Sequence, residues 1–319
     1  MPAHTRPRRR LVPLLDMRLV GAVCAVALAS CAEAPDSAFD VASYEREIAA
    51  WHADREARLK GPEGWLNLAG LHWLEPGRNT FGSAADNDIV IPQSRAAARI
   101  GEFVVESGAV RFTAAPGADV RADGTAVDSL ALSDDDPGPA AVLTHADLAF
   151  FVIDREGRLG IRLRDYRHPV LASFPGIESY PAAPRWRLDA QFRPYAEPRQ
   201  ISVATVVEGL GWEPIAPGVL EFEVDGETHS LEVLDSGDGL FVMFADGTTG
   251  TTTYPAGRYL YAEPPGADGT TVLDFNKAYN PPCAFNEFAT CPLPPRHNFL
   301  SVAIAAGEKY SDALHAPGS

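Results

Sequence analysis

The sequence predicts a mainly β protein, in which one N-terminal amphipathic helix precedes two β-sandwich or barrel-like domains. Beyond residue 61 the apolar segments are short and rich in β-branched and aromatic residues, a pattern that favours strands over helices. Glycine-containing pairs that are typical of hairpin turns separate these segments. The pairs are Asp123-Gly124, Glu156-Gly157, Asp225-Gly226, Asp238-Gly239 and Asp246-Gly247.

The N-terminus, residues 1–30, is predicted to be an export signal. Five arginines between positions 6 and 18 precede an apolar run, residues 19–30, that is too short to span a bilayer comfortably. The run ends in Leu28-Ala29-Ser30-Cys31, which resembles a bacterial lipobox cleaved before a lipid-carrying Cys31. The alternative is an ordinary secretory signal with a chance cysteine. Because Asp16 is unusual inside a signal, either Met1 or Met17 is the true start.

The tether, residues 31–43, is expected to attach the folded part to a membrane through Cys31. Ala32 follows the cysteine, and by resemblance to sorted lipoproteins this favours the outer membrane, facing the periplasm. The whole chain has 27 basic and 43 acidic residues, and removal of the signal leaves 22 and 42. Such an acidic body repels nucleic acid, so we expect no nucleic-acid partner.

A packing helix is predicted for residues 44–60. Ser43 is a candidate N-cap, and Glu45 and Glu47 are placed in the first turn, where the helix dipole favours acidic groups. Gly61-Pro62 ends the pattern. We expect the helix to dock on the first β domain through an apolar face formed by Tyr44, Ile48, Trp51 and Leu59.

Domain boundaries are predicted from composition. The first β domain is assigned to residues 61–175, a Pro/Gly-rich linker to 176–185, and the second β domain to 186–319. The expected strands include 103–105, 110–113, 148–154, 159–163, 201–207, 219–224, 231–234 and 240–244.

Cysteine positions predict a disulfide cross-link in the second domain. After export, Cys283 and Cys291 are the two cysteines of the folded part, and an oxidising periplasm favours a disulfide between them. The alternatives are two buried thiols or a metal pair, but no second ligand pair accompanies them, so no metal site is predicted.

Three segments resemble the bacterial family DUF1684, a domain of unknown function. They are GWLNLAGL at 64–71, GIRLRD at 160–165 and DFNKAYNPPC at 274–283. The resemblance extends from about Trp51 to Lys309 and implies no particular activity. Residues 77–83, 87–91 and 94–95 resemble the start of a forkhead-associated sandwich. Ser83 stands where that family has its phosphate-reading arginine, so this second resemblance implies the scaffold without phosphothreonine binding.

Catalytic and cofactor motifs are absent from the sequence. It contains no Gly-x-Ser-x-Gly elbow, no His-Glu-x-x-His pair and no phosphate loop, and no cofactor is expected. Carboxylates, a lysine, tyrosines and amides instead concentrate in the second domain, where they suit acid–base work or recognition of a hydroxyl-rich ligand. The alternative is that they cap turns, pin loops and fill the core. These candidate residues are Asp246, Tyr254, Arg258, Asp274, Asn276, Lys277, Tyr279 and Asn280.

A second candidate lies at the end of the first domain. Alternation along a strand places Arg162 and Arg164 on one face, where they either hold an anion or form an ion-pair lattice at the domain junction.

Two functions are compatible with the sequence. The first is an exported, periplasmic binding or assembly lipoprotein whose ligand or protein partner the sequence does not identify. The alternative is a hydrolase or isomerase that acts on a hydroxyl-rich small molecule through Asp274 and Lys277.

Overall fold

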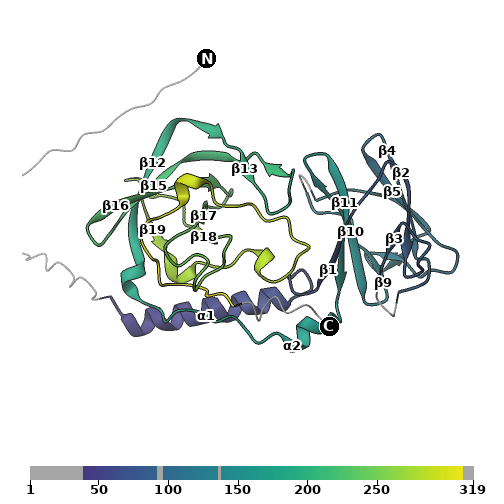
Figure 1. Cartoon of the computed structure of the whole chain (residues 1–319), viewed down its shortest axis with the longest axis horizontal. Helices are drawn as coiled ribbons and strands as arrows, with labels where there is room; N and C mark the ends of the chain where they lie inside the picture. The colour runs from purple at the N-terminus through teal and green to yellow at the C-terminus, as the bar shows by residue number, and fades with distance from the viewer. Residues whose placement is uncertain (1–38, 92–95, 136–137, 312–319) are drawn as a thin grey trace, which may run out of the picture. The chain divides into compact units, whose positions relative to one another are not determined.

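The computed structural model describes residues 39–91, 96–135 and 138–311 (Figure 1). From Val41 onward the chain forms one compact unit. The predicted mainly β fold with a preceding helix is confirmed. The predicted signal, with Cys31, lies outside the described residues, as does Ser94-Arg95 of the forkhead-associated pattern.

The predicted helix is confirmed as α1 (Val41–Lys60), although it begins earlier than expected. Because it starts at Val41, Ser43 lies inside the helix rather than at its N-cap, and the first turn contains no acidic residue. The chain turns sharply after α1 at Gly64, where a Cβ atom would lie 2.1 Å from the carbonyl oxygen of Leu59. Glycine is therefore required at this position.

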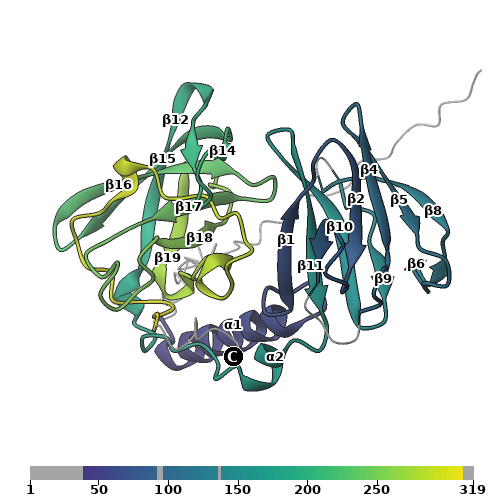
Figure 2. The ribbon, with the colours of Figure 1, turned by 45° about the vertical axis from the view of Figure 1, so that its right-hand side comes forward.

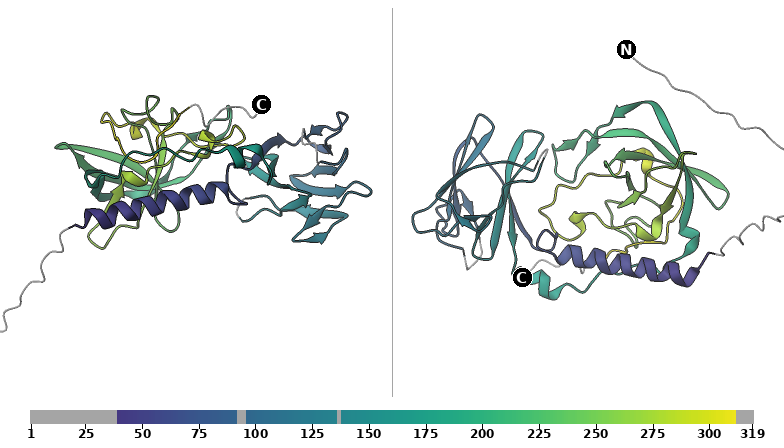
Figure 3. Two further views of the ribbon diagram at one scale, coloured as in Figure 1. Left: turned by 90° about the horizontal axis from the view of Figure 1, so that it is seen from below. Right: turned by 180° about the vertical axis from the view of Figure 1, so that it is seen from behind.

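The docking surface of α1 differs from the prediction. The helix packs beside the second β region, formed by the strands from β12 onward, against η2 and the C-terminal segment, and not on the first domain (Figures 1 and 3). The hydroxyl of Tyr44 donates to Asp274 at 2.7 Å, and Arg55 pairs with Glu308. Arg55 belongs to the buried face, which apolar spacing alone does not reveal. An acceptor for a buried arginine lowers the cost of its burial, and the acceptor of Arg55 lies in the second β region.

The first β region is a sandwich of two sheets. Phe150 from one sheet contacts Phe81 and Phe112 from the other, with ring centroids 4.9 and 5.6 Å apart, and all three are fully buried. One sheet has the order β1-β11-β10-β9-β6-β7 and the other β3-β2-β4-β5-β8. The strands are β1 (Leu68–Trp73), β2 (Gly77–Gly82), β3 (Ile89–Val90), β4 (Gly101–Glu106), β5 (Ala109–Ala114), β6 (Arg121–Ala122), β7 (Thr125–Ala126), β8 (Ser129–Leu132), β9 (Leu143–His145), β10 (Leu148–Arg155) and β11 (Arg158–Asp165).

The second β region is a six-stranded antiparallel sheet in the order β18-β17-β16-β15-β12-β19 (Figure 2). Its edge strands β18 and β19 contact each other, so the sheet curls towards a barrel. The predicted strand 201–207 is shorter than expected, since β13 pairs with β14 and Thr205 adds only an isolated bridge to Pro292. The elements from α2 onward are α2 (Pro169–Ser173), η1 (Pro184–Trp186), β12 (Arg187–Gln200), β13 (Val203–Ala204), β14 (Gly211–Trp212), β15 (Ile215–Val224), β16 (Glu227–Asp235), β17 (Leu240–Phe244), β18 (Arg258–Ala262), β19 (Thr270–Asp274), η2 (Phe275–Lys277), η3 (Pro282–Ala284) and η4 (Arg296–Asn298).

Three of the five predicted turn pairs have positive φ at both residues, as hairpin turns of the primed type require. These are Asp123-Gly124, Glu156-Gly157 and Asp225-Gly226. The other two differ from the prediction. Gly237 has positive φ in place of Asp238-Gly239, and the Asp246 carboxylate accepts a hydrogen bond from the backbone of Thr248, which caps a local turn.

The contact between Tyr44 and Asp274 predicts a measurable contribution to stability. Tyr44→Phe removes a hydroxyl that donates to a buried carboxylate, so we expect the free energy of unfolding to fall by about 1.5–3 kcal/mol. Urea denaturation measures the change. Tyr166→Phe is the matched control, because Tyr166 is 40% exposed, and it should leave stability unchanged. Equal stability of both variants would contradict the proposed anchoring of α1.

Candidate functional site

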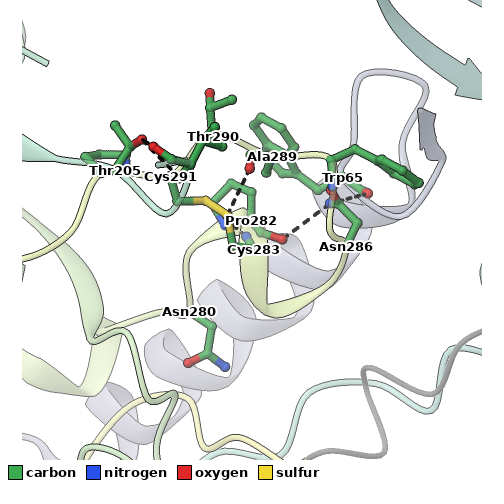
Figure 4. The surroundings of a disulfide bond; sticks show 12 residues. Trp65, Thr205, Asn280, Pro282, Cys283, Asn286, Ala289, Thr290 and Cys291 are labelled. Atoms are coloured by element: carbon green, nitrogen blue, oxygen red, sulfur yellow. Dashed lines mark hydrogen bonds between the residues drawn. A yellow bond between two sulfur atoms is a disulfide. The ribbon is translucent and has the colours of Figure 1, made fainter. Parts of the chain in front are cut away.

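A disulfide closes the loop that follows η3 (Figure 4). The Cα atoms of Cys283 and Cys291 are 6.2 Å apart, within the range expected for a bridge. The loop is fastened on two sides. Asn286 donates to the Trp65 carbonyl at 3.1 Å, and the Cys291 carbonyl accepts from the backbone of Val206 at 2.9 Å. It therefore connects the segment after α1 to the segment around β13.

A cavity of about 610 Å³ adjoins this loop, and its size is typical of small-molecule sites. Its walls come from α1, β10, β11, the loop before β14 with β14 itself, β17, β18 and the disulfide loop. Among the described residues that line it there are four arginines and no aspartate or glutamate. Seven aromatic side chains dominate the lining: Trp51, Trp65, Trp212, Phe241, Tyr259, Tyr261 and Tyr279.

Three tyrosines form one wall of the cavity, which we call the tyrosine wall: Tyr259, Tyr261 and Tyr279. The rings of Tyr261 and Tyr279 are stacked, with an interplanar angle of 10° and centroids 6.2 Å apart. Tyr259 packs edge-on to Tyr279 and donates to the Pro292 carbonyl at 2.6 Å. Burial raises the pKa of Tyr259 and Tyr279 above the usual range, so both are neutral at physiological pH. The wall therefore presents flat, uncharged faces.

Three of the four lining arginines have acidic partners. Arg55 pairs with Glu308, Arg58 with Asp54, and Arg155 with Asp135. Arg162 from β11 is 5% exposed and has no hydrogen bond or ion pair within the part of the chain that the structure describes. The sequence offered two interpretations of Arg162 and Arg164, an anion site or an ion-pair lattice. Arg164 differs from Arg162, because it donates to the side-chain oxygen of Asn67 at 2.7 Å.

The predicted site residues Asp246 and Arg258 form a fully buried ion pair. Their nearest charged atoms are 2.6 Å apart, and both side chains are completely inaccessible. Arg258 also donates to the carbonyl oxygens of Ile304 and Ala306. The pair therefore pins the C-terminal segment to β18, which is the structural alternative considered for Arg258.

The η2 residues join α1 and the linker to the second β region. Asp274 caps η2 and accepts from Tyr44, while Asn276 exchanges hydrogen bonds with the backbone of Ala183 at 2.9 and 3.0 Å. Lys277 pairs with Glu47 of α1 at 2.6 Å. The polar side chains of this segment therefore hold α1 and the linker against the second β region.

Of the remaining candidates, Tyr254 and Asn280 bond the backbone of other segments, and Tyr279 lines the cavity. Tyr254 donates to the Cys283 carbonyl at 3.0 Å, and the Asn280 side chain donates to the Lys309 carbonyl at 2.8 Å. Tyr279 lines the cavity. Of the eight predicted site residues, Tyr279 alone does so, and the structure does not gather the other seven around it.

Sequence reasoning missed most of the cavity. Tyr259 and Tyr261 alternate on β18 like ordinary core residues, while Trp65 lies between α1 and β1 and Trp212 lies in the short strand β14. The unusual density of aromatic residues at 259–279 was the available signal. Metal ligands do not cluster: within residues 39–91, 96–135 and 138–311, no three His, Cys, Asp or Glu side chains could hold an ion. None of the helices in these ranges has the length and apolar character needed to cross a membrane.

Comparison with known proteins identifies relatives without an assigned activity. The family model described as "Protein of unknown function (DUF1684)" matches residues 172–309, which confirms the predicted relationship for this part of the chain. The motifs at 64–71 and 160–165 lie outside the match. A solution structure of an uncharacterized protein from Haloarcula marismortui is similar, with 34% identity over 44% of this chain and 79% of that one, and a TM-score of 0.38. No curated protein matches the chain.

The burial of Asp246 and Arg258 predicts a structural role for the pair. Asp246→Asn leaves the Arg258 charge buried without its counterion, so we expect the free energy of unfolding to fall by about 3–5 kcal/mol. Chemical denaturation tests this expectation. Asp238→Asn, at an exposed turn, is the matched control and should be neutral. A variant at position 246 that is as stable as the wild type would show that the pair does not hold the C-terminal segment.

Proposed function

Since the chain belongs to the DUF1684 family, to which no activity is assigned, we propose its function from the cavity itself. The protein is an exported binding lipoprotein that holds a small molecule with an aromatic or otherwise apolar body. The observation that carries this proposal is the cavity of about 610 Å³ lined by seven aromatic side chains and by no acidic residue among those described.

The accessibility of the aromatic side chains supports a ligand. Tyr261 is 56% exposed and Trp212 is 39% exposed, although both border a concave surface. Large aromatic side chains gain free energy when their faces are covered, and apolar surface that remains uncovered is typical of binding sites. A flat ligand placed against the tyrosine wall would cover such faces.

The export part of the proposal rests on the sequence. A lipobox-like Leu28-Ala29-Ser30-Cys31 follows a short apolar run, and the acidic body is suited to a protein outside the cytoplasm. The disulfide between Cys283 and Cys291 is typical of an oxidising compartment such as the periplasm. Together these features favour a lipid anchor at Cys31 in the outer membrane.

The alternative, a hydrolase or isomerase, receives no support from the contacts. The Asp274 carboxylate accepts from Tyr44 and Asn276, and Lys277 pairs with Glu47. Neither residue lines the aromatic cavity. The binding function is therefore favoured.

The anchor predicts a specific fractionation result. In cells that export the protein, Cys31→Ser removes the acceptor for lipid, so the protein should move from the membrane fraction to the soluble periplasmic fraction or keep its signal. Immunoblotting of the fractions measures this outcome. Cys24→Ser, inside the signal, is the control and should leave attachment unchanged. Normal cleavage with continued membrane attachment of the Cys31 variant would refute the anchor.

The cavity predicts that ligand binding changes tryptophan emission. Three of the five tryptophans line it, so intrinsic fluorescence should report titration with a neutral aromatic probe such as 2-naphthamide. Tyr261→Ala removes one face of the tyrosine wall and should weaken binding roughly two- to tenfold. Tyr166→Ala, at an exposed residue that is not part of the lining, should have no effect. Identical affinities of the two variants would remove the support for this site.

A further inference from the structure

Arg162 is a buried cation at the edge of the aromatic cavity. Arg162 lines the cavity and is 5% exposed, and its Nε atom is buried without a hydrogen-bond partner. Its guanidinium carbon lies 5.4 Å from the centroid of the Trp65 ring. A buried guanidinium without an acceptor is costly, because its donors have lost water and gained nothing in exchange.

Other buried arginines of the protein show that acceptors are normally supplied. Arg258 pairs with Asp246 at 2.6 Å, and Arg55 pairs with Glu308 at 3.2 Å. Arg258 also leaves its Nε atom without a partner, but its terminal nitrogens donate to Asp246 and to two carbonyl oxygens, whereas within the described ranges Arg162 donates to no oxygen. The exception occurs at the wall of a cavity, where an acceptor can arrive from outside the chain.

The surroundings of Arg162 favour an anion. Burial and the neighbouring charges of Arg155 and Arg164 lower the pKa of Arg162 to about 10, so it is still protonated at neutral pH. Asp135 is the nearby acid, but its carboxylate is already held by two hydrogen bonds from Arg155. The cavity thus contains a positive charge that no lining residue among those described neutralises.

We propose that Arg162 anchors an oxyanion, a carboxylate or a phosphate, on a ligand whose aromatic or apolar body lies against the tyrosine wall. This inference rests on the proposed binding function and specifies the chemical class of the ligand. A guanidinium with unused donors can bind an oxyanion through two parallel hydrogen bonds, which fixes the orientation of the ligand as well as its charge. The aromatic lining then favours ligands whose remaining part is aromatic or apolar.

A matched set of three probes tests the inference: 2-naphthoate, 2-naphthyl phosphate and the neutral 2-naphthamide. Titration is followed by tryptophan fluorescence of the full-length protein. We expect at least one anion to bind about tenfold or more tightly than the amide, because a charge-assisted hydrogen bond replaces an unused donor. The stronger of the two anions identifies the carboxylate or the phosphate as the preferred group.

The decisive variant is Arg162→Met, which keeps an unbranched apolar chain and removes the charge. It should bind the anions no better than the amide, while its affinity for the amide is retained. Arg158→Met is the matched control, because Arg158 lies on the same strand, is exposed and stacks over Trp73 at 4.1 Å, outside the cavity. This control should preserve the preference for the anion.

Stability separates a binding role from a structural one. Because Arg162 makes no hydrogen bond within the described chain, Arg162→Met should melt at the wild-type temperature or above it. A marked fall in melting temperature would assign Arg162 to the structure instead. Arg162→Lys then keeps the charge without the planar fork, and it should retain only part of the preference for the anion.

The outcomes distinguish this inference from the proposed function. Equal affinity for anions and amide, or an anion preference that survives in Arg162→Met, would overturn the role of Arg162 and leave the aromatic site intact. Failure of all three probes to bind would overturn both proposals.

Discussion

The buried ion pair between Arg55 and Glu308 is the contact on which the rest of this architecture depends. Glu308 is completely inaccessible, and burial raises the pKa of its carboxyl even though Arg55 opposes that change. Arg55 comes from α1 and Glu308 from the C-terminal segment, and both also bond the backbone of Asn280, through its carbonyl and its amide. Removal of α1 or of the C-terminal segment would leave one buried charge without its partner, and removal of Asn280 would leave both charged groups with fewer hydrogen bonds, so each segment depends on the others.

The same contact positions the cavity. Tyr279 precedes Asn280, and its ring lies 4.8 Å below the Arg55 guanidinium, so the ion pair fixes the central ring of the tyrosine wall. The disulfide then closes the next turn of the chain, where Cys291 itself forms part of the lining. The polar and cysteine-rich segment that stands out in the sequence is therefore a support for the wall. Its conspicuous polar residues hold segments together, and the surface they support is aromatic.

This arrangement explains which features could be predicted from the sequence. The spacing of Tyr44, Ile48 and Leu59 indicates a helix, and Asp-Gly pairs indicate hairpins, because both signals are local. The docking of α1 could not be predicted, because the partner of Arg55 is 253 positions away and no local pattern connects the two. Polar groups at 274–280 were interpreted as a candidate site for a related reason. The same residue types cap turns and bind ligands, so the sequence alone does not separate the two roles, and the neighbouring residues in the structure do.

The treatment of buried charge distinguishes the cavity from the rest of the molecule. Glu232 is 3% exposed and accepts from Tyr195, Arg199 and His297, so that even a single buried carboxylate is surrounded by donors. Natural sequences satisfy such groups almost everywhere and deviate mainly at functional sites, where stability is lost in favour of function. Arg162 is such a deviation, and it lies where seven aromatic side chains meet a cavity. The unpaired guanidinium and the uncovered aromatic faces are two incomplete interactions, and one aromatic anion of suitable size would complete both.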